Sequence, residues 1–95
     1  MAITIKTDEE MDLMRKSGKI LAEVLKKTCA VARPGVSTWE LDKFAEDLII
    51  QMGGKPSFKG YHGFPCTICA SINEEVVHSI PRKDKILQKG DLLTI

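Results

Sequence analysis

The spacing of apolar residues along this chain changes once, and that change limits the possible fold. Up to Gly53-Gly54, apolar residues recur at helical spacing in two segments, residues 8–32 and 39–52. From Cys66 to Ile72, apolar residues take alternate positions, as in a strand with two different faces, and a second apolar run covers residues 92–95. We therefore predict an α+β fold in which two helices pack on an antiparallel sheet.

Local signals predict where the two helices begin and end. Thr7 and Ser37 each precede a glutamate by three residues, the spacing of a capping box. Arg33-Pro34-Gly35 ends the first helix and Gly53-Gly54 the second. Gly18 lies within the first helix, where glycine costs about 1 kcal/mol relative to alanine, so we expect another element to pack closely there.

Composition and charge exclude several classes of protein. Apolar residues make up 43% of the 95 and charged residues 28%, which suits one small folded domain. The 14 basic and 13 acidic residues interleave to a net charge of +1, so no charged face predicts a nucleic-acid partner. We find no signal peptide and no membrane-spanning run, and we expect a cytoplasmic protein without a membrane partner.

The three cysteines fit reduced thiols better than a disulfide framework. Cys66 and Cys69 have the spacing of a metal or redox pair. On a strand, residues three apart point to opposite faces, so these two thiols would not share an ion. We therefore expect buried or pocket-lining thiols at both positions and a packing role for Cys29.

The two histidines are the first candidates for chemistry. His62 and His78 both fall in segments rich in glycine or proline, where an imidazole can donate a hydrogen bond to a substrate; an ordinary surface histidine is the alternative. Three of the five aromatic residues, Phe58, Tyr61 and Phe64, flank His62. They indicate either a pocket wall or a satellite core beneath the loop.

Five blocks of sequence resemble the bacterial-type methionine aminopeptidases and follow in the same order. These blocks are Ile5-Lys6-Thr7, Pro34-Gly35-Val36-Ser37-Thr38 with Glu40-Leu41-Asp42, Gly60-Tyr61-His62-Gly63-Phe64-Pro65, Ser71-Ile72-Asn73-Glu74 with Val76-Val77-His78, and Leu87-x-x-Gly90-Asp91. The resemblance implies the pita-bread fold of creatinases and aminopeptidases, which has two related halves around a cleft. Residues 1–95 correspond to most of the first half, so we expect a single partial domain that stops before the metal-binding strands.

The resemblance implies an enzyme that removes initiator methionine from nascent proteins, with nascent amino termini as partners and the ribosome as a further candidate. In this family two divalent cations (Co, Mn, Fe or Zn) are held by two aspartates, a histidine and two glutamates. The first of these would directly follow Ile95. We therefore expect no metal ligand in this chain, no ion bound at the dinuclear site and no activity from the chain alone.

The resemblance also implies roles for individual residues. His78 matches the catalytic histidine that hydrogen-bonds the scissile amide region and stabilises the tetrahedral intermediate. His62 matches a histidine near the residue after methionine. The methionine side-chain pocket is matched by residues in two segments: Phe58, Tyr61, Phe64 and Cys69.

Two alternatives to a peptidase remain open. One is an isolated half-fold that serves as a structural or assembly module, and the other is a non-peptidase pita-bread relative. A half-sheet that ends in an apolar strand would expose an edge and a face that its other half normally covers, so we also expect self-association or instability of this chain.

Overall fold

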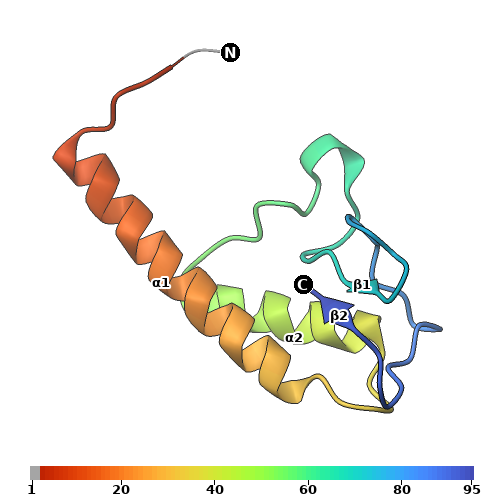
Figure 1. Cartoon of the computed structure of the whole chain (residues 1–95). Helices are drawn as coiled ribbons and strands as arrows, with labels where there is room; N and C mark the ends of the chain where they lie inside the picture. Colours follow the sequence, from red (N-terminus) through yellow and green to blue (C-terminus); the bar gives the residue numbers. More distant parts are fainter. Residues whose placement is uncertain (1–2) are drawn as a thin grey trace.

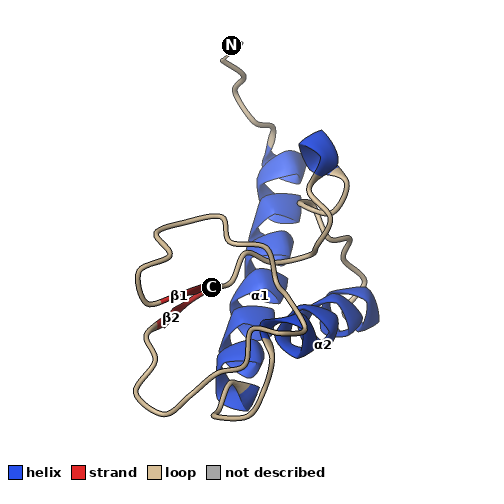
Figure 2. Cartoon of the chain, turned by 90° about the vertical axis from the view of Figure 1, so that its right-hand side faces the viewer, coloured by secondary structure: helices blue, strands red, loops and turns tan. Residues whose placement is uncertain are grey.

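The computed structural model describes residues 3–95. Two helices come first, α1 (Asp8–Val31) and α2 (Thr38–Gln51). A short 3-10 turn, η1 (Tyr61–Gly63), and two strands, β1 (Ser71–Ile72) and β2 (Leu93–Thr94), follow. Figures 1 and 2 both show α2 beside the carboxyl-terminal half of α1, and Figure 1 shows the loops and strands above α2. The expected α+β arrangement of two helices and an antiparallel sheet is confirmed.

Both helices start at the predicted caps. Thr7 Oγ1 accepts a hydrogen bond from the Glu10 amide at 3.1 Å, and Glu10 Oε1 accepts one from the Thr7 amide at 3.0 Å, which completes a capping box. Ser37 Oγ accepts from the Glu40 amide at 3.1 Å. Helix α2 stops before Gly53, whose φ of 85° leaves the helical region.

The apolar face of α1 is only partly covered. Val24 and Thr28 are its buried residues, whereas Leu21 is 64% exposed and Leu25 41%. A Cβ atom added to Gly18 would meet nothing within 4 Å, so the expected close packing at that glycine is wrong. Within residues 3–95, α2 covers the end of α1 and leaves its amino-terminal half open.

The sheet is much shorter than the sequence predicted. Strands β1 and β2 pair antiparallel, with Ser71 opposite Thr94 and Ile72 opposite Leu93, and Figure 2 shows them as two short arrows among loops. The predicted strand over residues 66–70 is absent. Burial does not alternate along this segment either, because consecutive residues are buried together.

A carboxylate explains why the segment before β1 is not a strand. Asp42 on α2 is 1% exposed, and its Oδ1 accepts hydrogen bonds from the amides of Thr67 at 2.7 Å and Ile68 at 2.8 Å. Those two amides are therefore satisfied by a side chain. The next contact, from the Ala70 amide to the Ser79 carbonyl at 3.0 Å, joins a loop and not a neighbouring strand.

The small core lies between α2, β1 and the segment before β2. It is built around Leu41, Ile72 and Leu87. The Leu87 amide donates to the Val36 carbonyl at 2.8 Å, and the Gly35 amide donates to the Leu87 carbonyl at 2.8 Å, so the chain after the loop returns to the start of α2. No helix within residues 3–95 has the length and apolar character of a membrane span.

We predict that Asp42→Ala lowers the free energy of unfolding by about 3 kcal/mol, because two amides lose a charged acceptor worth about 1.5–3 kcal/mol for each bond. Asp42→Asn keeps one acceptor oxygen and should lose less. Urea denaturation followed by circular dichroism measures both.

Asp47→Ala is the matched control, since Asp47 lies on the exposed side of the same helix. It should change the free energy of unfolding by less than about 0.5 kcal/mol. Equal losses from the alanine substitutions at 42 and 47 would contradict the role of the buried carboxylate.

Candidate functional site

Residues 58–64 form a compact turn that carries most of the candidate side chains. The Gly60 amide donates to the Phe64 carbonyl at 2.7 Å, and the Tyr61 amide donates to the Phe58 carbonyl at 2.9 Å. Gly60 and Gly63 have φ values of 84° and 77°, which glycine adopts without a Cβ penalty. The glycines therefore allow the turn to close, and its two hydrogen bonds set the positions of the neighbouring aromatic residues.

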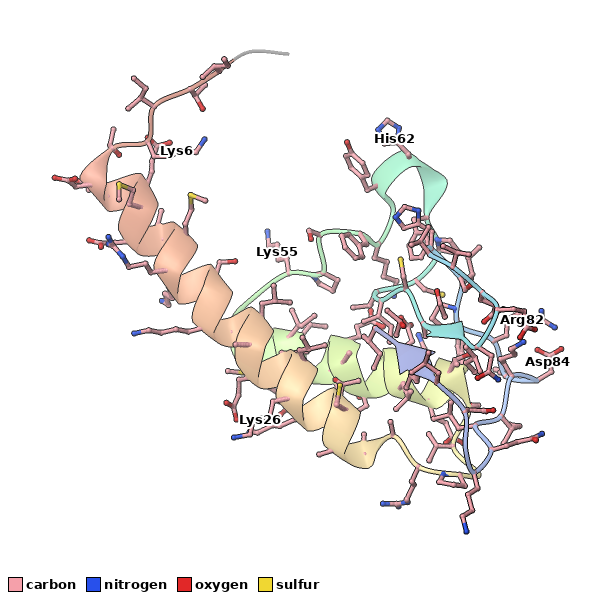
Figure 3. All side chains as sticks on the ribbon, in the orientation of Figure 1. Lys6, Lys26, Lys55, His62, Arg82 and Asp84 are labelled. Carbon is pink, nitrogen blue, oxygen red and sulfur yellow. The ribbon has the colours of Figure 1, made fainter. Side chains whose placement is uncertain are left out.

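The aromatic rings of this turn lie largely at the surface. Phe58 and Phe64 meet edge to face with centroids 6.4 Å apart, and Tyr61 meets the His62 ring at 4.2 Å. Tyr61 is 67% exposed and Phe58 52%. Figure 3 shows His62 at the outer tip of the molecule. A satellite core beneath the loop would bury these rings, so the arrangement favours an open apolar wall.

Both histidines have left-handed backbone conformations. His62 has φ 47° and His78 φ 58°, and Asn73, with φ 53°, is the other non-glycine residue of positive φ among residues 3–95. A left-handed residue with a Cβ costs about 1–2 kcal/mol, and such residues cluster at functional sites. The two imidazoles therefore stand at positions that the surrounding hydrogen bonds must hold.

An ion pair ties the turn of residues 58–64, which we call the aromatic turn, to α2. Lys59 Nζ lies 2.5 Å from Glu46 Oε1, and the Glu46 side chain is 15% exposed. The hydrogen bond from Lys59 lowers the pKa of Glu46 below its ordinary value of 4.5, and the same bond raises the pKa of Lys59. Lys43 Nζ lies 3.4 Å from the other Glu46 oxygen. This pair ties the turn to the middle of α2.

The loop that carries His78 is held against the segment after Cys69. The Ala70 amide donates to the Ser79 carbonyl at 3.0 Å, and the Ser79 amide donates to Ser71 Oγ at 3.4 Å. His78 itself is exposed. The backbone of the neighbouring Ser79 therefore fixes His78 beside the cysteine segment, while the imidazole remains exposed.

The two neighbouring cysteines lie in different surroundings. The predicted strand is absent over residues 66–70, so the alternation of strand faces does not separate the two thiols. Cys66 is 3% exposed in the interior, and Cys69 is half-buried on a groove wall. Burial raises the pKa of both thiols, which disfavours their thiolate forms.

The candidate residues do not all meet in one cavity. A groove of about 710 Å³, which we call the α1 groove, runs between the inner side of α1, the segments 53–58 and 67–69, and Ile95. Phe58 and Cys69 line it. Tyr61, His62, Phe64 and His78 are not part of its wall. Within the described part of the chain, no three side chains of His, Cys, Asp or Glu come together as metal ligands.

Sequence reasoning missed the side chains that hold this site together. Asp42 is buried with Thr38, Leu41 and Ala45, at the spacing i, i+3, i+4, i+7 of one helix face. That spacing was visible in the sequence, and an acidic residue on an apolar face should have predicted a buried hydrogen-bond acceptor. The pairing of Lys59 with Glu46 spans 13 positions and had no local signal.

Comparison with known proteins gives a consistent result. Residues 12–95 match the metallopeptidase family M24. The chain is 50% identical over 93 residues to a methionine aminopeptidase of Clostridium acetobutylicum, covering 98% of this chain and 37% of that protein. It is 45% identical over 96 residues to one of Escherichia coli K12, covering 100% of this chain and 36% of that protein. The resemblance identified in the sequence is confirmed.

Solved structures of methionine aminopeptidases share the fold. The enzyme of Thermotoga maritima gives a TM-score of 0.93 at 38% identity, covering 97% of this chain and 37% of that one. The enzyme of Rickettsia prowazekii gives 0.91 at 37% identity with the same coverage. The pita-bread fold is thereby confirmed, and the chain spans a little over one third of the relatives that it matches.

We predict that the Lys59–Glu46 pair makes the order of the aromatic turn pH-dependent. Because the pKa of Glu46 is lowered in the folded chain, the pair contributes its stabilisation above about pH 4.5 and loses it as the pH falls through the lower value. Amide hydrogen exchange at Gly60, Tyr61 and Phe64 should therefore speed up, relative to α2, below pH 4.5.

Glu46→Gln should give the same faster exchange at neutral pH, because a neutral amide cannot form the ion pair. Glu40→Gln, at an exposed position of the same helix, is the control and should leave exchange in the turn unchanged. If Glu46→Gln also leaves the turn fully protected, the ion pair does not hold it.

Proposed function

Because this chain belongs to metallopeptidase family M24, we propose that it supplies the substrate-recognition part of an aminopeptidase that removes initiator methionine from proteins. The observation that carries the proposal is the similarity over the whole chain to methionine aminopeptidases, at 45–50% identity. The chain spans 37% of the length of the Clostridium relative, so the proposal assigns to these residues only a part of the reaction.

We propose that the aromatic turn receives the methionine side chain. Phe58, Tyr61 and Phe64 offer exposed rings, and a thioether makes favourable contacts with aromatic edges. Cys69 would extend this apolar wall with a protonated thiol. The wall is open in residues 3–95, because Tyr61 and Phe58 are each more than half exposed. An unbranched apolar side chain could therefore lie along it.

We propose that the two histidines handle the polar part of the substrate. His78 is exposed, and its backbone is held by the contact between Ala70 and Ser79. An imidazole at such a position can donate a hydrogen bond to the scissile amide region and stabilise charge that develops on its oxygen. His62 would lie near the residue after methionine, beside the Tyr61 ring at 4.2 Å.

The family name implies a metal-dependent peptidase, and we propose two divalent cations (Co, Mn, Fe or Zn) as its cofactors. The described residues do not fit such a centre. Among residues 3–95 no three potential ligands converge. We propose that the ligands come from polypeptide outside this range, and we assign no step of the reaction to a metal here.

The partners and the location follow from the same proposal. Nascent amino termini would be the substrates, which would place the protein in the cytoplasm near the ribosome. A structural module or a non-peptidase relative is not favoured, because the matched proteins of high identity are methionine aminopeptidases.

We predict that the purified 95-residue chain, supplied with Co²⁺ or Mn²⁺, releases no methionine from a Met-Ala-Ser peptide. The reason is that its described residues lack a set of converging ligands. Chromatography of free methionine measures the outcome. Metal-dependent release above the rate of a buffer blank would show that this chain builds its own metal centre.

A chimera tests the proposed function directly. Residues 1–95 joined to the part of the Clostridium acetobutylicum enzyme that follows its aligned 93 residues should release methionine from Met-Ala-Ser. His78→Ala in this chimera should lower kcat/KM about 100-fold to 1,000-fold, the usual worth of a positioned hydrogen-bond donor.

Lys83→Ala is the control for the chimera, since Lys83 is an exposed residue of the following loop. It should keep the activity of the parent chimera. A folded chimera with bound metal but no methionine release, or one in which His78→Ala has no effect, would refute the assignment.

A further inference from the structure

We propose that Glu75 is a positioning residue for His78: its carboxylate closes the turn before this histidine and holds the backbone from which the imidazole extends. The inference rests on the proposed function, in which His78 meets the scissile amide region. Glu75 lies three residues before the histidine, and neither the α1 groove nor the aromatic turn includes it.

The turn after β1 is closed by two hydrogen bonds between the same two residues. The Glu75 amide donates to the Ile72 carbonyl at 3.1 Å, and the Ile72 amide donates to Glu75 Oε1 at 2.8 Å. The first bond belongs to an ordinary backbone turn. The second has a charged acceptor, which makes it stronger than a bond between neutral groups. Glu75 thus fastens the turn to Ile72, the buried last residue of β1.

The Ile72 amide depends on this side chain, because β2 does not reach it. Strand β2 pairs with β1 on one edge, where the Asn73 amide donates to the Leu92 carbonyl at 2.8 Å. Successive amides along a strand point to opposite edges, so the Ile72 amide points to the edge that β2 leaves open. A buried backbone amide is normally paired. Glu75 supplies the acceptor that the two-stranded sheet does not.

The second carboxylate oxygen connects the turn to the start of α2. Lys85 Nζ lies 3.5 Å from Glu75 Oε2, and the Glu75 side chain is 27% exposed. The Lys85 carbonyl accepts a hydrogen bond from the Thr38 amide at 2.9 Å. Arg82 pairs instead with Asp84, its Nε 2.8 Å from Oδ1, and Figure 3 shows these two side chains together at the edge of the molecule. Glu75 therefore joins β1 to a loop that α2 holds.

The two interactions of the Glu75 carboxylate differ in strength. The hydrogen bond from Ile72 lowers the pKa of Glu75 below its ordinary value of 4.5, and the charges of Lys85 and Arg82 act in the same direction. The amide bond is the stronger anchor, because an ion pair 3.5 Å apart near the surface contributes little. We therefore expect a neutral acceptor at position 75 to keep most of the effect.

The segment that carries His78 is anchored at its two ends. At the far end, the Ser79 carbonyl accepts from the Ala70 amide at 3.0 Å, and at the near end the anchor is Glu75. Residues 76–78 between them are exposed, so packing contributes little to holding them. His78 has a φ of 58°, a conformation that a loose segment would leave. Loss of the near anchor should therefore let the backbone relax and move the imidazole.

The experiment uses the chimera of residues 1–95 with the part of the Clostridium acetobutylicum enzyme that follows its aligned 93 residues. Glu75→Ala should lower kcat for Met-Ala-Ser about 10-fold to 100-fold, since a shift of about 1 Å can lower a rate about 100-fold. KM should change less than about twofold, because the histidine acts mainly in the transition state. Glu75→Gln keeps an acceptor oxygen and should lower kcat less than about threefold.

Glu74→Ala is the matched control, since Glu74 is the same residue type at the adjacent, exposed position. It should keep the kcat of the parent chimera. A loss from Glu75→Gln as large as that from Glu75→Ala, or equal losses from the alanine substitutions at 74 and 75, would contradict the amide bond as the anchor.

A double-mutant cycle separates positioning from a general loss of structure. In the His78→Ala chimera, Glu75→Ala should have no further effect on kcat, because Glu75 acts only through this imidazole. Losses that add in the double variant would overturn the inference, as would a Glu75→Ala chimera with the full kcat of its parent.

Hydrogen exchange measured by mass spectrometry on the same chimeras needs no activity. Residues 72–79 should exchange faster in Glu75→Ala than in the parent or in Glu74→Ala, while unchanged exchange in α2 verifies the fold. Unchanged exchange of residues 72–79 would overturn the inference. A folded parent chimera that releases no methionine would refute the proposed function alone, and the exchange would then decide whether Glu75 holds the histidine segment.

Discussion

The arrangement of this chain depends on the hydrogen bonds that Asp42 accepts from the amides of Thr67 and Ile68. The carboxylate is buried and sits on a helix, so it fixes a point of an otherwise irregular segment relative to the most regular part of the fold. From that point the chain continues to Cys69 and β1, and the contact between Ala70 and Ser79 extends the same order to the histidine loop. A rigid helix thus determines the position of residues that have little regular structure of their own.

Helix α2 repeats this arrangement at intervals of four residues. The Thr38 hydroxyl accepts from the Arg82 amide at 2.8 Å, and Glu46 pairs with Lys59 at 2.5 Å, with Asp42 between them. Residues four apart lie one above the other on a helix, so these three side chains form one row. Each member holds a different loop. The spacing of the three loops is therefore set by the pitch of a single helix, which explains how a small core supports several exposed segments.

The sequence predicted those features that local residues determine. The capping box at Thr7, the cap at Ser37 and the glycine after α2 involve neighbours in the chain, and all appeared where expected. The strand over 66–70 failed because the partner of its amides is a carboxylate 25 residues away, which alternation of side chains cannot reveal. The prediction at Gly18 failed for a different reason, because no other element packs against this glycine within residues 3–95. The histidines were found as candidates, but their left-handed backbone came only from the structure.

The row of side chains on α2 explains how the strained backbone of the two histidines is held in place. A left-handed residue costs about 1–2 kcal/mol and would relax in a free loop. At His62 the turn is closed by the bond between Gly60 and Phe64 and tied to Glu46 through Lys59. Ser79, the neighbour of His78, is tied to Ala70, which follows the Thr67 and Ile68 amides held by Asp42 by three and two residues. Because both anchors lie on one helix, the backbone segments that carry the two histidines are held on the same helix while the side chains stay exposed, as the proposed contacts to a substrate require.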